Sequence, residues 1–177
     1  MPELITPSVP SLSPETWHLA IRELHEYWIS IHPSAGLPGR QHVDPSAITN
    51  LLPHVFMVDV TRNPLRFKYR LVGTDYVQMM GKDLTGGFLD EVHPGFHGLI
   101  LHQYTETAEL GRPAYRKGPV MYTRPHRDYL GMERLIVPLA RNGIEVDMIL
   151  GVIVATLSNE RRASLADFLH PRTHERL

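Results

Sequence analysis

The 177-residue chain contains no cysteine. This absence excludes disulfides, thiolate nucleophiles, Cys-ligated zinc, iron–sulfur clusters and any cofactor attached through a cysteine. No apolar run approaches the roughly 18 residues that a membrane span requires. The first residues, Met1 to Pro7, lack the basic and apolar regions of a signal peptide. We therefore expect a cytoplasmic protein that does not act at a membrane.

An excess of charge of one sign is also missing. The chain has 18 Lys and Arg against 19 Asp and Glu, for a formal net charge of -1. This balance lacks the basic patch that a nucleic acid or an anionic membrane would need. A hydrophobic content of 42% with 21% charged residues is typical of a globular chain. The composition predicts one globular domain with no nucleic-acid partner.

The N-terminal third is predicted to carry one amphipathic helix. Residues 1–12 are rich in proline and are expected to form a mobile arm. Ser13 and Pro14 suit the cap and first position of a helix over residues 13–32. Apolar residues then recur at steps of four and three, as in a heptad seam; they are Trp17, Ile21, Leu24, Trp28 and Ile31. This seam must pack either on its own domain or in a homodimer interface, and we assign these five residues to the dimer interface.

The rest of the chain alternates between strand and helix patterns. A short helix is expected over residues 45–52, and longer helical patterns over 74–80 and 96–110. Strands are expected over 54–60, 66–72, 115–122, 128–139 and 146–156, with a hairpin at Asn142-Gly143. The tail, residues 158–177, is expected to be partly helical. This order predicts an α+β fold, with a five-stranded antiparallel sheet, helices on one face and a flanking N-terminal helix.

Several short motifs then suggest a family. They include Asp44-Pro45 through Pro53, Phe67 to Thr74, Gly81 to Gly86, Gly111-Arg112-Pro113 and Glu133 to Leu139 before Asn142-Gly143. With them, residues 40–157 resemble a PAS domain, in particular the short stand-alone bacterial PAS-domain proteins. The resemblance implies a sensory or signalling module. It implies a small ligand in the core, a homodimer, and a separate signalling protein that receives the output.

Two other functions remain open beside this one. The first is a ligand-free adaptor that works through protein contacts. The second is a small enzyme using histidines and Glu133 as acid–base groups, but no nucleophile or phosphate-binding motif supports catalysis. We therefore predict a binding protein rather than an enzyme.

The candidate ligand site follows from the PAS resemblance. Neighbouring strand residues face opposite ways, so either Glu133 or Arg134 should face the helix-covered side. Adaptable methionines also suit a pocket. The residues expected to line a cavity are Tyr69, Tyr76, Met79, Phe88, His97, Leu101, Tyr104, Met121 and Glu133.

No cofactor is required by the sequence, and no metal site is predicted. His93 and His97 have helical metal spacing, but His93 precedes Pro94, which disfavours helical geometry. The resemblance allows haem ligation through His97 or His102, because some members of the family hold haem from the matching helix. The commoner role for such histidines is a hydrogen bond at the margin of the core.

Overall fold

The computed structural model describes residues 16–93, 97–119 and 130–157. The arm expected over residues 1–12 and the tail over 158–177 lie outside these ranges. The helices are α1 (Leu19–Ser30), the 3-10 helices η2 (Arg40–His42) and η3 (Pro45–Leu51), α2 (Thr74–Met80), α3 (Leu89–Val92) and α4 (His97–Leu110). The strands are β1 (Val55–Thr61), β2 (Arg66–Val72), β3 (Ala114–Pro119), β4 (Leu130–Leu139) and β5 (Met148–Leu157).

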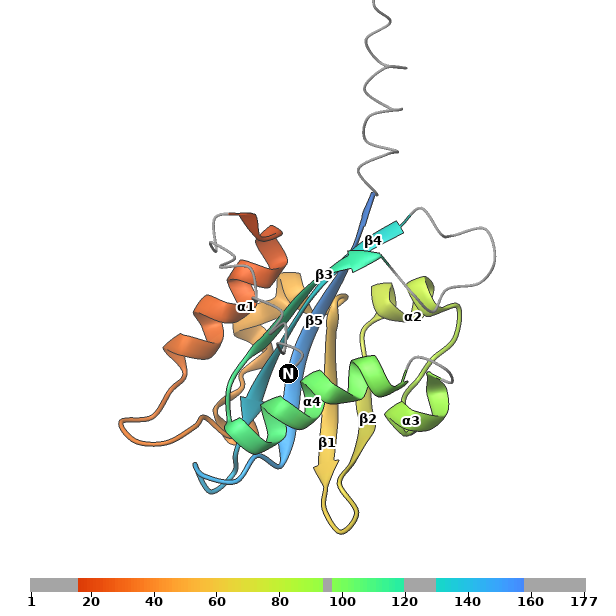
Figure 1. Ribbon diagram of the computed structural model, residues 1–177. Helices are drawn as coiled ribbons and strands as arrows, with labels where there is room; N and C mark the ends of the chain where they lie inside the picture. The colour runs from red at the N-terminus through yellow and green to blue at the C-terminus, as the bar shows by residue number, and fades with distance from the viewer. Residues whose placement is uncertain (1–15, 94–96, 120–129, 158–177) are drawn as a thin grey trace, which may run out of the picture.

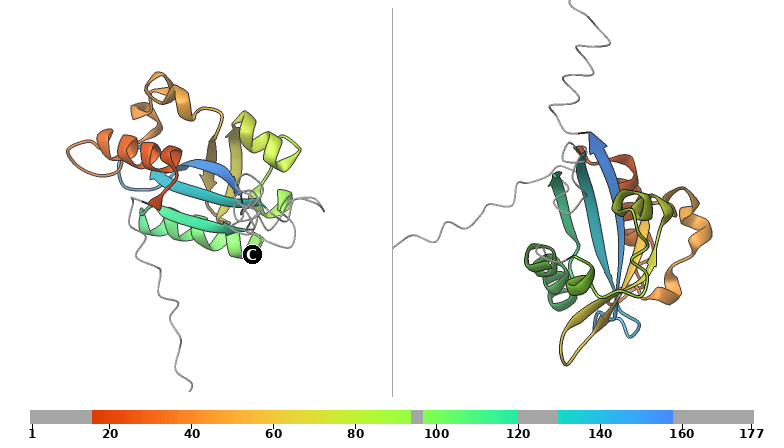
Figure 2. Two further views of the ribbon diagram at one scale, coloured as in Figure 1. Left: turned by 90° about the horizontal axis from the view of Figure 1, so that it is seen from above. Right: turned by 90° about the vertical axis from the view of Figure 1, so that its right-hand side faces the viewer.

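The five strands form one antiparallel sheet in the order β2-β1-β5-β4-β3. Helices α2, α3 and α4 cover one face, and α1 with η3 covers the other (Figures 1 and 2). The predicted α+β class and five-stranded sheet are confirmed. The N-terminal helix takes the position of a flanking helix on the second face.

Two apolar cores follow from the alternation of side chains along the strands. On β1, Phe56 and Val58 point into the core beneath α2 and α4, whereas Val55 and Met57 point into the core beneath α1. A side chain at Gly151 would overlap the ring of Phe56, so only glycine leaves room for this ring against β5. The central strands are therefore apolar on both faces.

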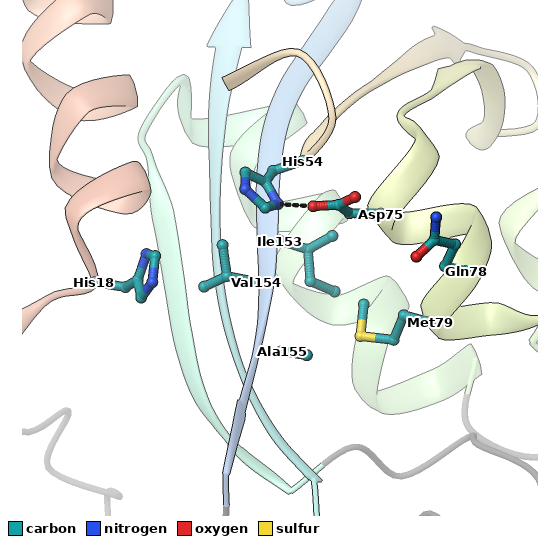
Figure 3. A pocket seen from close by; sticks show the side chains of 8 residues that line it. All are labelled: His18, His54, Asp75, Gln78, Met79, Ile153, Val154 and Ala155. Carbon is teal, nitrogen blue, oxygen red and sulfur yellow. Dashed lines mark ion pairs between the residues drawn. The ribbon is translucent and has the colours of Figure 1, made fainter. Parts of the chain in front are cut away.

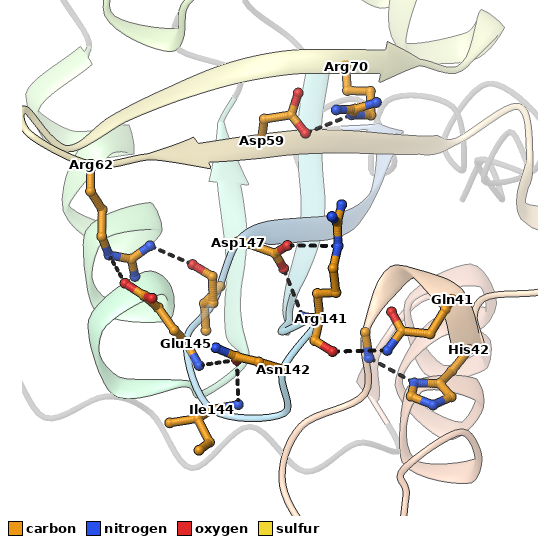
Figure 4. Close-up of polar contacts among 12 residues, drawn as sticks. Gln41, His42, Asp59, Arg62, Arg70, Arg141, Asn142, Ile144, Glu145 and Asp147 are labelled. Atoms are coloured by element: carbon orange, nitrogen blue, oxygen red, sulfur yellow. Dashed lines mark hydrogen bonds and ion pairs between the residues drawn. The ribbon is translucent and has the colours of Figure 1, made fainter.

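The hairpin between β4 and β5 is tied to its surroundings by polar contacts (Figure 4). Gly143 has a φ of +78°, which glycine tolerates without strain. The side chain of Asn142 accepts hydrogen bonds from the backbone N–H groups of Ile144 and Glu145. Arg62, which follows β1, reaches Glu145 at 3.0 Å and the carbonyl of Val146 at 2.8 Å. These contacts fix the turn expected from Asn142-Gly143.

Helix α1 begins at Leu19, six residues after the predicted start at Ser13. The side chain of His18 accepts the hydrogen bond of the Ala20 N–H at 3.2 Å and so takes the capping role expected of Ser13. Trp17 precedes the helix and stacks on Tyr115 of β3, with ring centroids 5.0 Å apart. The start of the helix is thus set by contacts with the sheet, which the local capping pattern did not include.

The apolar seam of α1 packs on the sheet of its own chain. Ile21, Leu24 and Trp28 are buried there, with Ile31 and Trp17 packed at the margin. The indole N–H of Trp28 donates to the carbonyl of Pro138 at 3.0 Å. This corrects the assignment of the seam to a dimer interface, because these side chains are already covered within one chain. A homodimer remains a prediction, but it needs another surface.

Replacing Trp28 tests this packing. We expect Trp28→Ala to lower the free energy of unfolding by about 3–5 kcal/mol, because it opens a cavity and removes a buried hydrogen bond. Ile29→Ala, one residue further along the helix and 53% exposed, should change it by less than about 0.5 kcal/mol. Urea unfolding followed by circular dichroism measures both. Equal losses in the two variants would contradict packing of α1 on the sheet.

Candidate functional site

Three polar side chains meet inside the core beneath the helices. The hydroxyl of Tyr69 on β2 lies 3.0 Å from the hydroxyl of Tyr76 on α2 and 3.0 Å from Nε2 of His93. All three residues are at most 2% exposed. Hydrogen bonds offset the cost of burying such groups among apolar side chains. This polar network connects β2, α2 and the residue that follows α3.

The burial of His93 determines its charge. Loss of water lowers the pKa of His93 to about 4, and the nearby charges of Arg134 and Lys82 act in the same direction. His93 is therefore neutral at neutral pH. A neutral imidazole has one donor and one acceptor nitrogen, so it can either give a hydrogen bond to Tyr69 or accept one.

A buried cation lies on the same face of the sheet. Arg134 of β4 is 2% exposed, and its guanidinium contacts the side-chain oxygen of Gln103 on α4. The guanidinium carbon also lies 5.2 Å from the centre of the Tyr104 ring, within the range of a cation–π contact. The core beneath α4 therefore contains a permanent positive charge next to an aromatic ring.

The neighbouring residue, Glu133, faces the opposite way. Its carboxylate accepts a hydrogen bond from the backbone N–H of His18 at 2.8 Å and pairs with Lys117 of β3 at 2.7 Å. Burial alone would raise the pKa of Glu133, but Lys117 and the N–H of His18 outweigh it, so the pKa is lowered. The structure thus corrects the expectation that Glu133 lines the core beneath the helices. Arg134 takes that position.

These contacts attach the start of α1 to the sheet. We call this cluster the α1 anchor; it comprises Trp17, His18, Tyr115, Lys117 and Glu133. Trp17 stacks on Tyr115 at an interplanar angle of 13°, and Glu133 holds the backbone just before the helix. Burial, followed by the charge of Glu133, raises the pKa of Tyr115 to about 12. The anchor therefore combines one carboxylate with a cation and an aromatic stack.

The predicted lining residues are partly brought together. Tyr69, Tyr76, Met79 and Tyr104 lie in one buried cluster, with Leu101 packed against it. Phe88 lies elsewhere, because its ring is 3.7 Å from the guanidinium of Arg66 at the outer edge of β2. Two further predictions cannot be placed, since Met121 lies outside the described residues and the side chain of His97, the first residue of α4, is not described.

Three polar core residues escaped the sequence prediction: His93, Gln103 and Arg134. The proline after His93 argues against a helical metal site and gives no sign of a buried hydrogen bond. For Arg134 the sequence offers only the choice between it and Glu133, and the register between β4 and its neighbours is needed to make that choice. The second histidine considered for haem, His102, has a side chain that is 71% exposed and lies 3.7 Å from Glu106. It does not face the core.

An open cleft of about 700 Å³ lies beside the last part of β5. Figure 3 shows His18 on one side of this strand and Met79 on the other. Nδ1 of His54 lies 3.1 Å from the carboxylate of Asp75 at its wall. The complete lining is His18, His54, Asp75, Gln78, Met79, Ile153, Val154 and Ala155. Met79 also belongs to the buried cluster, so it separates the cleft from the polar network.

Comparison with known proteins identifies the fold. Residues 16–154 match the family model of the PAS domain. The chain belongs to the PAS domain family. The PAS domain of BvgS from Bordetella pertussis is similar in structure, with a TM-score of 0.52 at 15% identity, covering 70% of this chain and 91% of that one. No curated protein matches this PAS domain.

Two further solved structures show weaker similarity to this PAS domain. A sensory box sensor histidine kinase from Vibrio cholerae has a TM-score of 0.47 at 8% identity, covering 63% of this chain and 88% of that one. A LOV protein from Rhodobacter sphaeroides has a TM-score of 0.47 at 13% identity, covering 70% of this chain and 74% of that one.

Among the helices of the described residues, none has both the length and the hydropathy of a membrane-spanning segment.

The neutral state of His93 predicts a pH dependence of stability. Unfolding raises the pKa of His93 from about 4 to about 6.5, so the unfolded chain binds more protons in this window. The contribution of neutral His93 to the free energy of unfolding is therefore fully present above about pH 7. It is lost progressively as the pH falls below about 6.5. Between pH 7 and pH 5 this histidine should cost about 2 kcal/mol of unfolding free energy, at about 1.4 kcal/mol per pH unit.

Urea unfolding at pH 7 and pH 5 measures this loss. His93→Gln should reduce the difference between the two pH values by about that amount, because the titrating group is gone. His102→Gln, a substitution of an exposed histidine, should leave the difference as in the wild type. The same pH dependence in all three proteins would show that His93 is not held neutral.

The α1 anchor predicts a local effect of its carboxylate. Glu133→Gln removes the charge that pairs with Lys117 and weakens the bond to the His18 N–H, so we expect a loss of about 1–3 kcal/mol in unfolding free energy. Amide exchange at His18 should accelerate. Glu145→Gln removes a carboxylate that is 59% exposed and pairs with Arg62. It should cost less than about 1 kcal/mol and leave exchange at His18 unchanged.

Proposed function

We propose that this PAS domain is a sensory module that binds a small ligand in the core beneath α2 and α4. The observation that carries the proposal is the polar network of Tyr69, Tyr76 and His93 among the apolar side chains of this core. Hydroxyl groups and a neutral imidazole are the kind of sparse, oriented polar contacts that fix a small molecule in an apolar pocket. Arg134 adds a cation on the same face.

The cleft supplies a route to this core. Met79 lines the cleft and packs in the buried cluster, and its unbranched side chain has several rotamers available. A rotamer change at this residue would open the interior near Tyr76, three residues earlier on the same helix. The ligand therefore enters beside α2 without unfolding the sheet.

The signal passes to the other face of the sheet through β4. Arg134 lies in the core where the ligand would bind, and its guanidinium contacts Gln103. The adjacent Glu133 accepts a hydrogen bond from the backbone N–H of His18, just before α1. A ligand that displaces Arg134 changes the backbone of β4 at the residue that positions His18. The resulting shift of α1 is the output, read by a separate signalling protein or by a second copy of the chain. The role is binding rather than catalysis, and the compartment is the cytoplasm.

A ligand-free adaptor is the second candidate. The observation that favours it is that Tyr69, Tyr76 and His93 hydrogen-bond one another, so the hydroxyl of Tyr69 has two partners without a guest. In that case the buried network serves to hold α2 and α3 in place. The exposed surface of the domain would then act by binding another protein.

Native mass spectrometry of the freshly purified full chain, together with an absorbance spectrum, distinguishes the two. The sensor predicts an excess mass over the chain, and a visible band if the ligand is a chromophore such as haem. His93→Gln should remove at least about nine-tenths of the excess, since a lost polar contact in an apolar site costs over 1 kcal/mol. His102→Gln should retain it. A bare mass and a flat spectrum in the wild type would favour the adaptor.

A further inference from the structure

Strand β5 extends beyond its neighbour β1. The two strands pair from Asp59↔Met148 to Val55↔Val152, and the last hydrogen bond runs from the N–H of Ile153 to the carbonyl of His54 at 3.1 Å. There the chain before β1 turns away, whereas β5 continues to Leu157. In the part of the chain that the structure describes, no strand pairs with this last stretch on the β1 side.

The backbone of the continuing stretch presents hydrogen-bonding groups to the cleft. Backbone N–H and C=O groups alternate between the two sides of a strand. Because Ile153 points its N–H toward β1, Ala155 points its backbone groups the same way, into the space that β1 has left. Ala155 is exposed and lines the cleft. The cleft therefore has an open strand edge along one wall and helix α2 along the other (Figure 3).

The N-terminal segment, residues 1–15, joins the described domain close to that edge. It leads into Thr16, and His18, two residues after Thr16, lines the cleft. Within this segment Leu4-Ile5-Thr6 has apolar and β-branched side chains, which favour an extended strand. Pro2 and Pro7 lack the backbone N–H and so limit pairing to a few residues. Ile5 lies eleven positions before Thr16, a span of up to about 36 Å when extended.

We propose that residues 4–6 of the N-terminal arm add as a short strand to the open edge of β5, in line with β1. Three residues of the arm match the stretch from Ala155 to Leu157. The apolar side chains of the arm contact Met79 and Ile153, and the N–H and C=O groups of Ala155 gain partners. Unpaired strand edges commonly attract such additions. The docked arm covers the cleft within a single chain, and this holds whether or not the core binds a ligand.

Disulfide trapping in the full chain tests the contact, because the protein has no cysteine of its own. The pair Ile5→Cys and Ala155→Cys is treated with diamide and followed by mass and by a non-reducing gel. Cross-linking within one chain should be at least about tenfold faster than for the control pair Ile5→Cys and Ile144→Cys. Ile144 is 85% exposed and precedes the start of β5, at the far end of that strand. Both cross-linking positions on the domain are exposed, so the fold is retained.

Two results would overturn the proposal. Equal rates for the two pairs would mean that the arm has no preferred place on the domain. A cross-link between two chains would mean that the cleft takes the arm of a second copy.

A second measurement tests the backbone hydrogen bonds between the arm and β5. Ile5→Pro in the full chain deletes the backbone N–H of the residue placed opposite Ala155 and removes its β-branched side chain, whereas Leu12→Pro alters the arm outside the strand. Amide exchange at Ala155 should accelerate at least about tenfold in Ile5→Pro and stay at the wild-type rate in Leu12→Pro. Unchanged exchange in Ile5→Pro would refute strand addition.

Discussion

Glu133 and Arg134 occupy successive positions on β4, and both are buried because this strand is covered on each face. A strand sends neighbouring side chains to opposite sides, so one residue pair puts an anion beneath α1 and a cation beneath α4. Each charge then requires partners. Lys117 and the N–H of His18 meet the anion, and Gln103 with the ring of Tyr104 meets the cation. The position of α1 and the polarity of the core beneath α4 both depend on this alternation of side chains along β4.

The two buried charges differ in what keeps them ionised. A carboxylate between a lysine and a backbone N–H remains ionised, as the lowered pKa of Glu133 shows. The guanidinium of Arg134 stays charged even when buried, and its field contributes to keeping His93 neutral. The core beneath the helices therefore holds one fixed cation and one neutral imidazole. The tyrosine hydroxyls between β2 and α2 complete this set of buried polar groups.

Much of this fold could be predicted from the sequence because strands and hairpins carry local signals. Alternation in residues 66–72 and Asn-Gly at 142–143 were sufficient to place β2 and the β4–β5 turn. The start of α1 could not be predicted from local signals. Ser13-Pro14 is a good local cap, but Trp17 stacks on Tyr115 of β3, a strand distant in sequence, and the helix begins only after this contact. The side of Glu133 could not be predicted either. A register shift of one residue exchanges the two faces, and register depends on pairing between strands.

The ends of the two buried clusters meet at one place on the surface. Beyond Ile153, none of the strands in the described residues pairs with β5 on the β1 side. The cleft there touches His18, which belongs to the α1 anchor, and Met79, which packs against the tyrosine network. The wall between these two residues is a single strand, with Val154 facing one core and Ile153 the other. A group bound in this cleft therefore contacts the margins of both cores, which links occupancy of the cleft to the packing of α1 and of α2.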